Sequence, residues 1–225
     1  MRKHRNIVLI MMLFSIISCK KINFLSQIDN VQQSPKQKNI KFKEFGNPNI
    51  QSEKFPTEWK INTYDDESTK ISKSDEEVQK KFESLDYFKN LKTGKNSAFL
   101  RNSSFVKKDS LLNLAKIDSL TIIDSTFVSN KDKIFYAKTI ATLDDGKSEF
   151  PIGISRLDMI LVEGNKVKNA INLYSETDYS YLTKQKNCYI DKNGAISCVN
   201  FIIDETKVSF KGSSKLNAKK IFNLK

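Results

Sequence analysis

The sequence predicts a mainly β fold with a minor helical part (α+β), in which an antiparallel meander of about eight strands forms a barrel or a sandwich. Three observations predict it. From Ile117 onward, short runs of β-branched and aromatic residues follow the period of strands. Turn signals such as Asp144-Asp145-Gly146 and Gly164-Asn165 separate these runs at short intervals. The helical period occurs before Ile117, so one or two short helices should pack at one end or edge of the strands.

The part of the chain before the helices has a different composition. Residues 19–73 are rich in Lys, Asn, Gln, Ser and Pro, with scattered single hydrophobic residues. Such a composition is typical of a tether and an irregular N-terminal arm. Within it, Trp59 and Ile61 alternate with polar residues, which predicts a first short strand over residues 56–63.

Two segments have helical signals. Residues 74–90 combine an apolar stripe with a capping box, because Ser74 is followed three positions later by Glu77. Residues 109–116 (DSLLNLAK) predict a shorter second helix. The apolar stripe of the first helix consists of Val78, Phe82, Leu85 and Phe88.

The strands should follow in sequence order and pair through hairpins, because their connections are short and rich in turn residues. The folded β-rich domain is therefore expected to span residues 74–225. The expected strands are residues 120–128, 134–143, 149–154, 157–162, 167–174, the two arms of a hairpin within 187–199, then 201–203, 207–211 and 220–224.

The N-terminus has the features of a secretory signal peptide. A basic stretch, MRKHR, precedes about eleven apolar residues, too short a run for the roughly 20 that a spanning helix needs. The run ends in Ile16-Ile17-Ser18-Cys19, which resembles the lipobox of bacterial lipoproteins. The resemblance implies that residues 1–18 are removed and that Cys19 is acylated, which attaches the protein to the lipid bilayer. The alternative is ordinary signal cleavage near Ser18.

The residue after the lipobox cysteine bears on the location. Lys20 occupies the position where an inner-membrane retention signal tends to have Asp. The resemblance therefore implies an outer-membrane lipoprotein of the cell envelope. Lys20 and Lys21 replace the acidic residues that often follow the cysteine of surface-exported lipoproteins, which favours a domain facing the periplasm.

The three cysteines fit this interpretation. Lipidation of Cys19 leaves Cys188 and Cys198 as a pair. They flank residues 191–194 (Asp-Lys-Asn-Gly), a turn signal for a hairpin that brings the two cysteines level with each other. An oxidising envelope then favours a disulfide. The alternative is two unpaired buried thiols.

Charge and composition exclude several classes of function. The formal net charge is +12, but the basic residues are almost all lysine, without a Lys/Arg block, so we predict no nucleic-acid binding. The single histidine, His4, lies in the segment that signal cleavage would remove. Histidine-dependent catalysis and the usual zinc, copper and haem sites are therefore excluded, and we predict no metal and no cofactor.

Two short matches to penicillin-binding proteins do not predict catalysis. Residues 104–107 match S-x-x-K and residues 92–94 match K-T-G, but their order is reversed and no S-D-N lies between them. No catalytic residue is predicted.

The sequence thus predicts a membrane-anchored lipoprotein that acts as a binding or interaction module for a protein or small ligand, and it leans against an enzyme. The alternative is a histidine-free hydrolase that uses two carboxylates on glycan or peptidoglycan. A further possibility is a barrel that holds an apolar molecule in a cavity lined by Ile140, Ile160 and Ile171.

Overall fold

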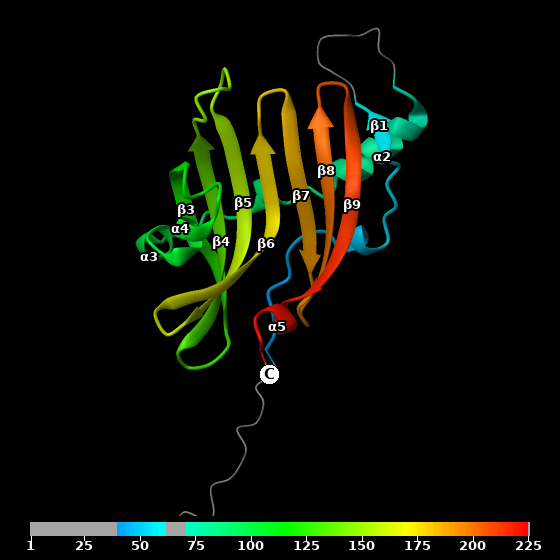
Figure 1. The fold of residues 1–225 in the computed structure, drawn as a ribbon. Helices are drawn as coiled ribbons and strands as arrows, with labels where there is room; N and C mark the ends of the chain where they lie inside the picture. The colour runs from blue at the N-terminus through cyan, green and yellow to red at the C-terminus, as the bar shows by residue number, and fades with distance from the viewer. Residues whose placement is uncertain (1–39, 62–70, 225) are drawn as a thin grey trace, which may run out of the picture. The chain divides into compact units, whose positions relative to one another are not determined.

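The computed structural model describes residues 40–61 and 71–224, which belong to one compact unit, Asn39–Lys225 (Figure 1). Cys19 and the expected signal peptide lie outside the described residues. The helices are η1 (Pro48–Gln51), α2 (Lys73–Glu83), η2 (Phe88–Asn90), α3 (Ala98–Arg101), α4 (Ser104–Lys108) and α5 (Ala218–Ile221). The strands are β1 (Glu58–Lys60), β2 (Lys95–Asn96), β3 (Lys116–Phe127), β4 (Asp132–Leu143), β5 (Ile152–Glu163), β6 (Lys166–Asp178), β7 (Leu182–Ile190), β8 (Ala195–Asp204) and β9 (Lys207–Asn217).

The nine described strands form a single antiparallel sheet in the order β1-β9-β8-β7-β6-β5-β4-β3-β2. From β2 to β9 each strand pairs with the next one in the sequence, and β1 pairs with the outer side of β9. The mainly β class and the antiparallel meander expected from the sequence are confirmed. The meander does not close into a barrel and does not divide into the two sheets of a sandwich, because β1 and β2 remain as the two edges of one sheet.

Strand β5 replaces the two strands expected over residues 149–154 and 157–162. It runs without interruption from Ile152 to Glu163 beside β4. Ser155 and Arg156, at the expected break, pair in regular register with β6, and the register shifts only beyond them, between Leu157 and Asp158. Both faces of β5 are buried: Leu157 and Ile160 belong to different core clusters.

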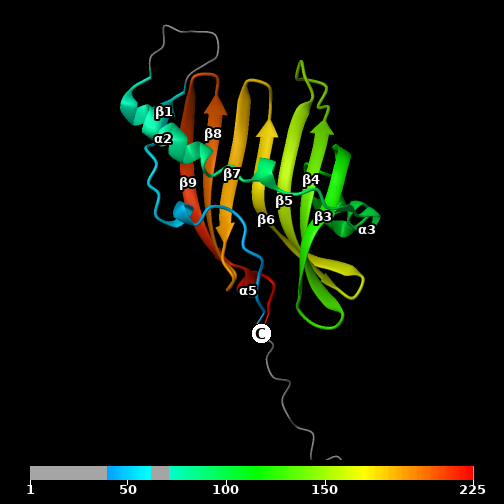
Figure 2. The ribbon, with the colours of Figure 1, turned by 180° about the vertical axis from the view of Figure 1, so that it is seen from behind.

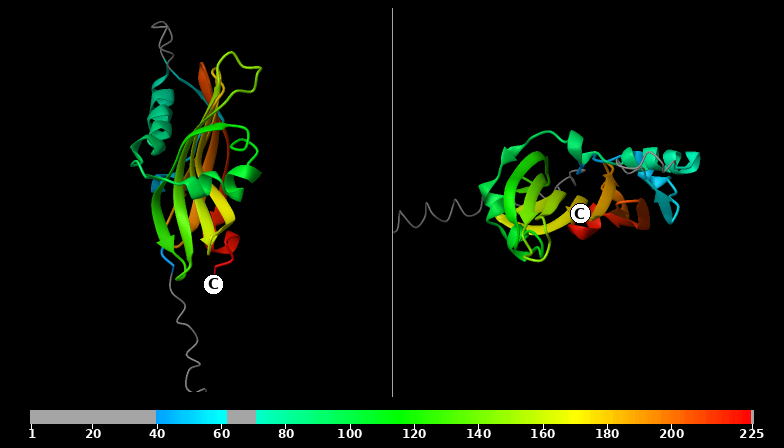
Figure 3. Two further views of the ribbon diagram at one scale, coloured as in Figure 1. Left: turned by 90° about the vertical axis from the view of Figure 1, so that its left-hand side faces the viewer. Right: turned by 90° about the horizontal axis from the view of Figure 1, so that it is seen from above.

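The chain before β3 supplies the cover for both faces of the sheet. The segment that carries α2 and η2 crosses one face, as Figure 2 shows, then passes the edge of the sheet as β2. Helices α3 and α4 follow on the other face, so the views of Figure 3 place α2 and α4 on opposite sides of the strands. Residues 157–162 of β5 are therefore buried on both faces, which explains why all of them except Asp158 are apolar.

Residues 40–61, which the sequence places with the N-terminal arm, pack into the core. Ile40 and Phe42 are 8% and 3% exposed and belong to the same apolar cluster as Tyr136. Trp59 of β1 is 2% exposed, whereas its two neighbours in the strand are exposed. This is the alternation that the expected strand over residues 56–63 predicts. Its indole Nε1 donates a hydrogen bond to Gln79 Oε1 of α2 at 3.1 Å, which ties β1 to the helix.

The N-cap of α2 is Ser72, not the expected Ser74. Ser72 has an extended backbone, and its Oγ accepts a hydrogen bond from the Asp75 backbone N–H at 3.1 Å. The acidic residue three positions after the cap is thus Asp75, and its Oδ2 accepts a hydrogen bond from the Ser72 hydroxyl at 2.8 Å. The helix ends at Glu83, and Phe88 lies beyond it in η2, where it is 6% exposed.

Two expected elements have a different structure. Residues 109–116 are not a helix, because the Asp109 carboxylate accepts hydrogen bonds from the Leu111 and Leu112 backbone N–H groups and closes a turn. The short helices α3 and α4 come before it, and Ser97 and Ser103 cap them. Residues 220–224 were expected as a strand, but the Asn217 side chain caps α5 there instead.

The cysteine hairpin has the predicted geometry. Cys188 of β7 and Cys198 of β8 lie directly opposite each other and form a disulfide, with their Cα atoms 4.0 Å apart. In the turn, the Asp191 carboxylate accepts hydrogen bonds from two backbone N–H groups, and Gly194 takes the left-handed conformation with φ +86°. The predicted disulfide is therefore confirmed, and closing so short a loop contributes about 2 to 3 kcal/mol in the chain-entropy description.

Candidate binding groove

Three adjoining hollows form a groove between helices α3 and α4 and the β5–β6 hairpin. The α4 hollow, of about 430 Å³, lies between α4 and strands β5 and β6. It shares Ser104 and Val167 with the α3 hollow, of about 580 Å³. The α3 hollow in turn shares Phe99 and Asn165 with the turn hollow, of about 320 Å³, beside the β3–β4 turn.

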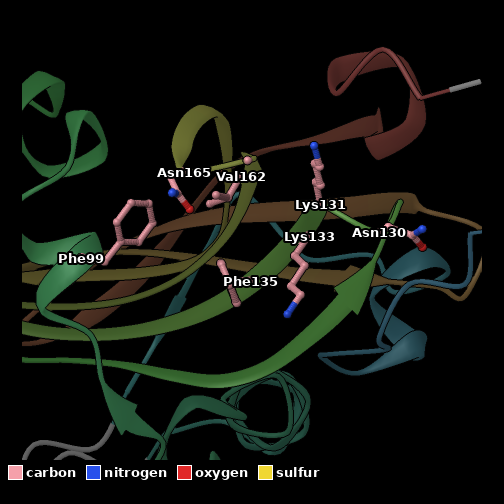
Figure 4. Close-up of a pocket in the computed structure, with 8 residues that line it drawn as sticks. Phe99, Asn130, Lys131, Lys133, Phe135, Val162 and Asn165 are labelled. Carbon is pink, nitrogen blue, oxygen red and sulfur yellow. The ribbon is translucent and has the colours of Figure 1, made fainter.

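Lysine, asparagine and aromatic side chains line the groove. Figure 4 shows the turn hollow, in which Phe135 and Val162 lie between Phe99 of α3 and the lysines of the β3–β4 hairpin. Phe99 is 42% exposed although it is large and apolar, so part of its ring is free to contact a ligand. The lysines that line the three hollows are Lys108, Lys131, Lys133, Lys166 and Lys168.

A buried ionic cluster forms the floor of the α4 hollow. The Arg156 guanidinium binds Asp158 through two hydrogen bonds, from Nε to Oδ2 at 3.1 Å and from Nη2 to Oδ1 at 2.8 Å. Its Nη1 donates to Asp109 Oδ2 at 2.6 Å. A single guanidinium therefore holds both carboxylates in fixed positions, in the fork geometry that arginine favours.

Strands β6 and β7 complete the cluster. Asn172 Nδ2 donates to Asp158 Oδ1 at 3.1 Å and to the Tyr174 carbonyl oxygen at 2.7 Å. Lys186 Nζ donates to the Asn172 carbonyl oxygen at 2.9 Å. Asp158 is 0% exposed, so this network provides the partners that a buried carboxylate requires.

The pKa shifts follow from burial and from these contacts. Burial raises the pKa of Asp158 above its usual range, although Arg156 and Asn172 act against the change. Burial acts in the same direction on Asp109, but the Leu112 backbone N–H and Arg156 outweigh it and hold the pKa of Asp109 below its usual range. Burial lowers the pKa of Lys186, and the Asp158 charge opposes it.

The cluster is suited to holding a binding surface in place. Asp158 is fully buried and both of its oxygens accept hydrogen bonds from Arg156, so it has no free face toward a ligand. Asp109 is bound to the same guanidinium. By contrast, Lys108 and Lys166 are exposed and form no ion pair with any residue that the structure describes. The groove therefore offers free cations and amide groups, while both of its carboxylates are bound to Arg156.

Sequence reasoning did not find this cluster. The signal available was Arg156 followed two residues later by Asp158, since residues two apart in a strand share a face. Asp109 is 47 residues from Arg156 in the sequence and enters the cluster through the turn after α4. Asp109 joins the cluster only through the tertiary structure, and no local sequence pattern predicts this contact.

The residues singled out in the sequence lie in separate parts of the fold. The disulfide cysteines join β7 to β8, and Cys19 lies outside the described residues. Ser104 of the S-x-x-K match begins α4 and lines the groove. The K-T-G match ends in Gly94, where an added Cβ would lie 2.3 Å from the Ile122 carbonyl oxygen, so this glycine is required for the close approach of the chain to β3.

The residues proposed to line an internal cavity do not share one. Ile160 and Ile171 belong to two different core clusters, and Ile140 is 41% exposed. The sheet is also open at both edges. These three residues therefore do not hold a ligand inside a closed barrel, contrary to the expectation from the sequence.

Comparisons of the chain with protein-family models, with curated proteins and with solved structures give no match in any of the three. In the described ranges, 40–61 and 71–224, no helix combines the length and the apolar character needed to cross a membrane. The N-terminal sequence and the groove are therefore the two features of the chain that bear on its function.

Proposed function

We propose that this protein is a lipid-anchored lipoprotein of the bacterial outer membrane, whose folded domain faces the periplasm and binds an anionic ligand in the groove. The anchor is supported by the signal sequence that ends at Cys19. The disulfide between Cys188 and Cys198 supports it as well, because disulfides persist in oxidising compartments and because the pairing leaves Cys19 free for acylation.

One observation carries the choice of ligand: five lysines line the groove, whereas both carboxylates that line it are bound to Arg156. Lys168 is paired with Glu163 at 3.2 Å, and a ligand with carboxylate or phosphate groups would gain charge-assisted hydrogen bonds from the other four lysines. The asparagines suit hydroxyl and amide groups, and Phe99 suits the apolar face of a sugar ring. An acidic glycan of the cell envelope combines all of these features.

The groove gives little support to the alternative of a carboxylate hydrolase. Such an enzyme needs one carboxyl group that reaches the scissile bond as an acid and a second that acts as base or nucleophile. In the groove, Asp158 is fully buried and Asp109 is held by the same guanidinium. We therefore propose binding without hydrolysis.

The anchor is tested by substituting Cys19→Ser in the full chain. The wild-type protein is expected to incorporate labelled palmitate in its bacterial host and to sediment with membranes, because two or three acyl chains make the attachment durable. The Cys19→Ser variant is expected to incorporate no label. Equal labelling of both proteins, or no labelling of either, would remove the anchor from the proposal.

The ligand is tested by calorimetric titration with a short oligogalacturonate, which carries a carboxylate on each sugar, and with a neutral oligosaccharide of the same length. We expect binding of the acidic oligosaccharide that weakens with salt, and no binding of the neutral one. Lys108→Ala should weaken binding about tenfold or more, because it removes a charge-assisted hydrogen bond.

The matched control for this titration is Lys107→Ala. Lys107 precedes Lys108 on the same helix and is exposed, but it does not line the hollows described above. It should leave the affinity within about twofold of wild type, as expected for a surface charge outside the site. Equal weakening by both variants, or equal binding of both oligosaccharides, would contradict recognition of an anionic ligand by the groove.

A further inference from the structure

The antiparallel meander places its connections at two opposite ends. The turns β3–β4, β5–β6 and β7–β8 lie at one end, which α5 joins after β9, as Figure 1 shows. The turns β4–β5, β6–β7 and β8–β9 lie at the other end. We call the first the basal end, residues 128–133, 163–168, 191–194 and 215–220, and the second the distal end, residues 143–151, 178–184 and 204–207.

The described chain begins at the basal end. The Phe42 backbone N–H donates to the Lys192 carbonyl oxygen in the β7–β8 turn at 3.0 Å. Ile40 belongs to the same core cluster as Ala218 and Phe222, on and next to α5. Residues 20–39 separate Ile40 from Cys19, and an extended chain of about 20 residues spans at most about 70 Å. A lipid on Cys19 would therefore hold the basal end within this distance of the bilayer.

The two ends carry opposite charge. The basal end holds eight lysines and three carboxylates, whereas the distal end holds six carboxylates and three lysines. Two of the basal carboxylates are engaged by the turns themselves: Asp132 accepts hydrogen bonds from Ser129 and Gly164, and Asp191 accepts two backbone N–H groups. Within residues 40–61 and 71–224, no carboxylate forms an ion pair with the basal lysines Lys131, Lys133, Lys166, Lys215, Lys219 and Lys220.

Exposed apolar side chains accompany these lysines. Phe127 precedes the β3–β4 turn and is 55% exposed, with Lys133 Nζ 4.4 Å from the centre of its ring. Leu216 precedes α5 and is 37% exposed. Basic side chains next to isolated apolar ones are typical of surfaces that rest at the interface of an anionic bilayer.

We propose that the basal end lies on the anionic phospholipid headgroups of the leaflet that holds Cys19. The inference rests on the proposed lipid anchor and deepens it, because the lysines would orient a domain that the anchor alone only tethers. The acidic distal end is repelled by the same surface, so the charge separation favours one orientation. Lysines are attracted to an anionic bilayer only within about a Debye length of its surface. The lysines of the basal turns, which would lie nearest the headgroups, therefore contribute most to this attraction.

The test uses the chain from residue 19 onward with Cys19→Ser, so that no acyl group contributes. Sedimentation with vesicles of phosphatidylethanolamine and phosphatidylglycerol is compared with sedimentation with neutral phosphatidylcholine vesicles. We expect binding to the anionic vesicles, loss of binding at high salt, and no binding to the neutral ones. Reversing three of the basal charges that form no ion pair, Lys131→Glu, Lys215→Glu and Lys220→Glu, should weaken binding on the order of a hundredfold.

The control reverses three exposed lysines at or beside the distal end, Lys60→Glu, Lys147→Glu and Lys184→Glu, and should keep the affinity within about threefold. Circular dichroism establishes that both variants are folded. Equal losses in the two variants, or equal binding to both kinds of vesicle, would overturn the docking of the basal end. The palmitate labelling of Cys19 is independent of this outcome, so failure of docking and failure of the anchor are distinguishable. Of the five groove lysines only Lys108 lies outside the basal end, so Lys108→Ala should leave vesicle binding unchanged.

Discussion

Replacing Arg156 with methionine should lower the free energy of unfolding by about 3 to 5 kcal/mol, measured by urea denaturation. The substitution leaves Asp158 fully buried with a carboxylate that has lost its two hydrogen bonds to the guanidinium. An uncompensated buried charge is among the largest single destabilising effects known in proteins. The free energy of unfolding of a small domain is about 5 to 15 kcal/mol, so the substitution removes a large part of it.

The effect of Arg156→Met should depend on pH in a defined direction. Without the guanidinium, burial is still opposed by the Asn172 hydrogen bond but no longer by Arg156, so the pKa of Asp158 rises further in the folded state. The folded variant then binds a proton more strongly than the unfolded chain does. Its stability is therefore lost as the pH rises through the folded pKa and recovered as the pH falls toward the unfolded value of about 3.9. The destabilisation should be smaller near pH 5 than near pH 8.

The double variant Arg156→Met with Asp158→Leu is the matched control. It removes the buried charge together with its partner, and apolar replacements of buried ion pairs are often neutral or stabilising. We expect it to recover more than half of the loss. A double variant as unstable as the single one, or a loss for Arg156→Met that does not change with pH, would show that the packing of the arginine stem and not the charge accounts for the effect.

The sequence predicts those parts of this molecule that local physical chemistry determines. The β7–β8 hairpin is an example, because its turn depends on Asp191 and Gly194 and its disulfide depends on the equal distances of Cys188 and Cys198 from that turn. Most strands are also predicted, because side chains that alternate between two environments leave a period of two in the sequence. Strand β5, buried on both faces, leaves a weaker signal and was divided into two.

The parts that were not predicted depend on contacts between distant segments. Strand β1 pairs with β9, and Glu58 lies opposite Ser209, 151 residues later. The ionic cluster joins Asp109 to Arg156 across 47 residues. The choice between a barrel, a sandwich and an open sheet also depends on contacts between distant segments. It is decided by whether the edge strands pair with each other or are covered by the N-terminal segment.

The aromatic cluster around Phe201 shows how that segment is held. Phe201 of β8 is 1% exposed, and its ring centre lies between 5.0 and 5.9 Å from four other aromatic rings. Three of these contacts are edge-on, those to Phe55, to Trp59 of β1 and to Phe82 of α2. A β-strand near the C-terminal end of the chain therefore anchors both β1 and α2. The fourth ring, that of Phe210, is tilted at 50° to Phe201.

Phe201→Ala should therefore lower the free energy of unfolding by about 3 to 5 kcal/mol, because it removes a fully buried ring and leaves a cavity among partners that are fixed to different elements. Amide hydrogen exchange should report a local effect as well: the Ile61 backbone N–H, which donates to the Thr206 carbonyl oxygen beside β1, should exchange faster relative to the amides of β4 and β5. Both results follow if the cluster fastens the N-terminal segment to the sheet.

Two variants distinguish this fastening from a general loss of core packing. Phe201→Leu retains most of the apolar volume and should lose less than half as much stability. Phe127→Ala removes the same side chain from a site that is 55% exposed and should change stability by less than about 0.5 kcal/mol. If Phe201→Ala increased exchange equally in every strand, the cluster would be one part of a uniform core, and the N-terminal segment would owe its position to contacts elsewhere on the sheet.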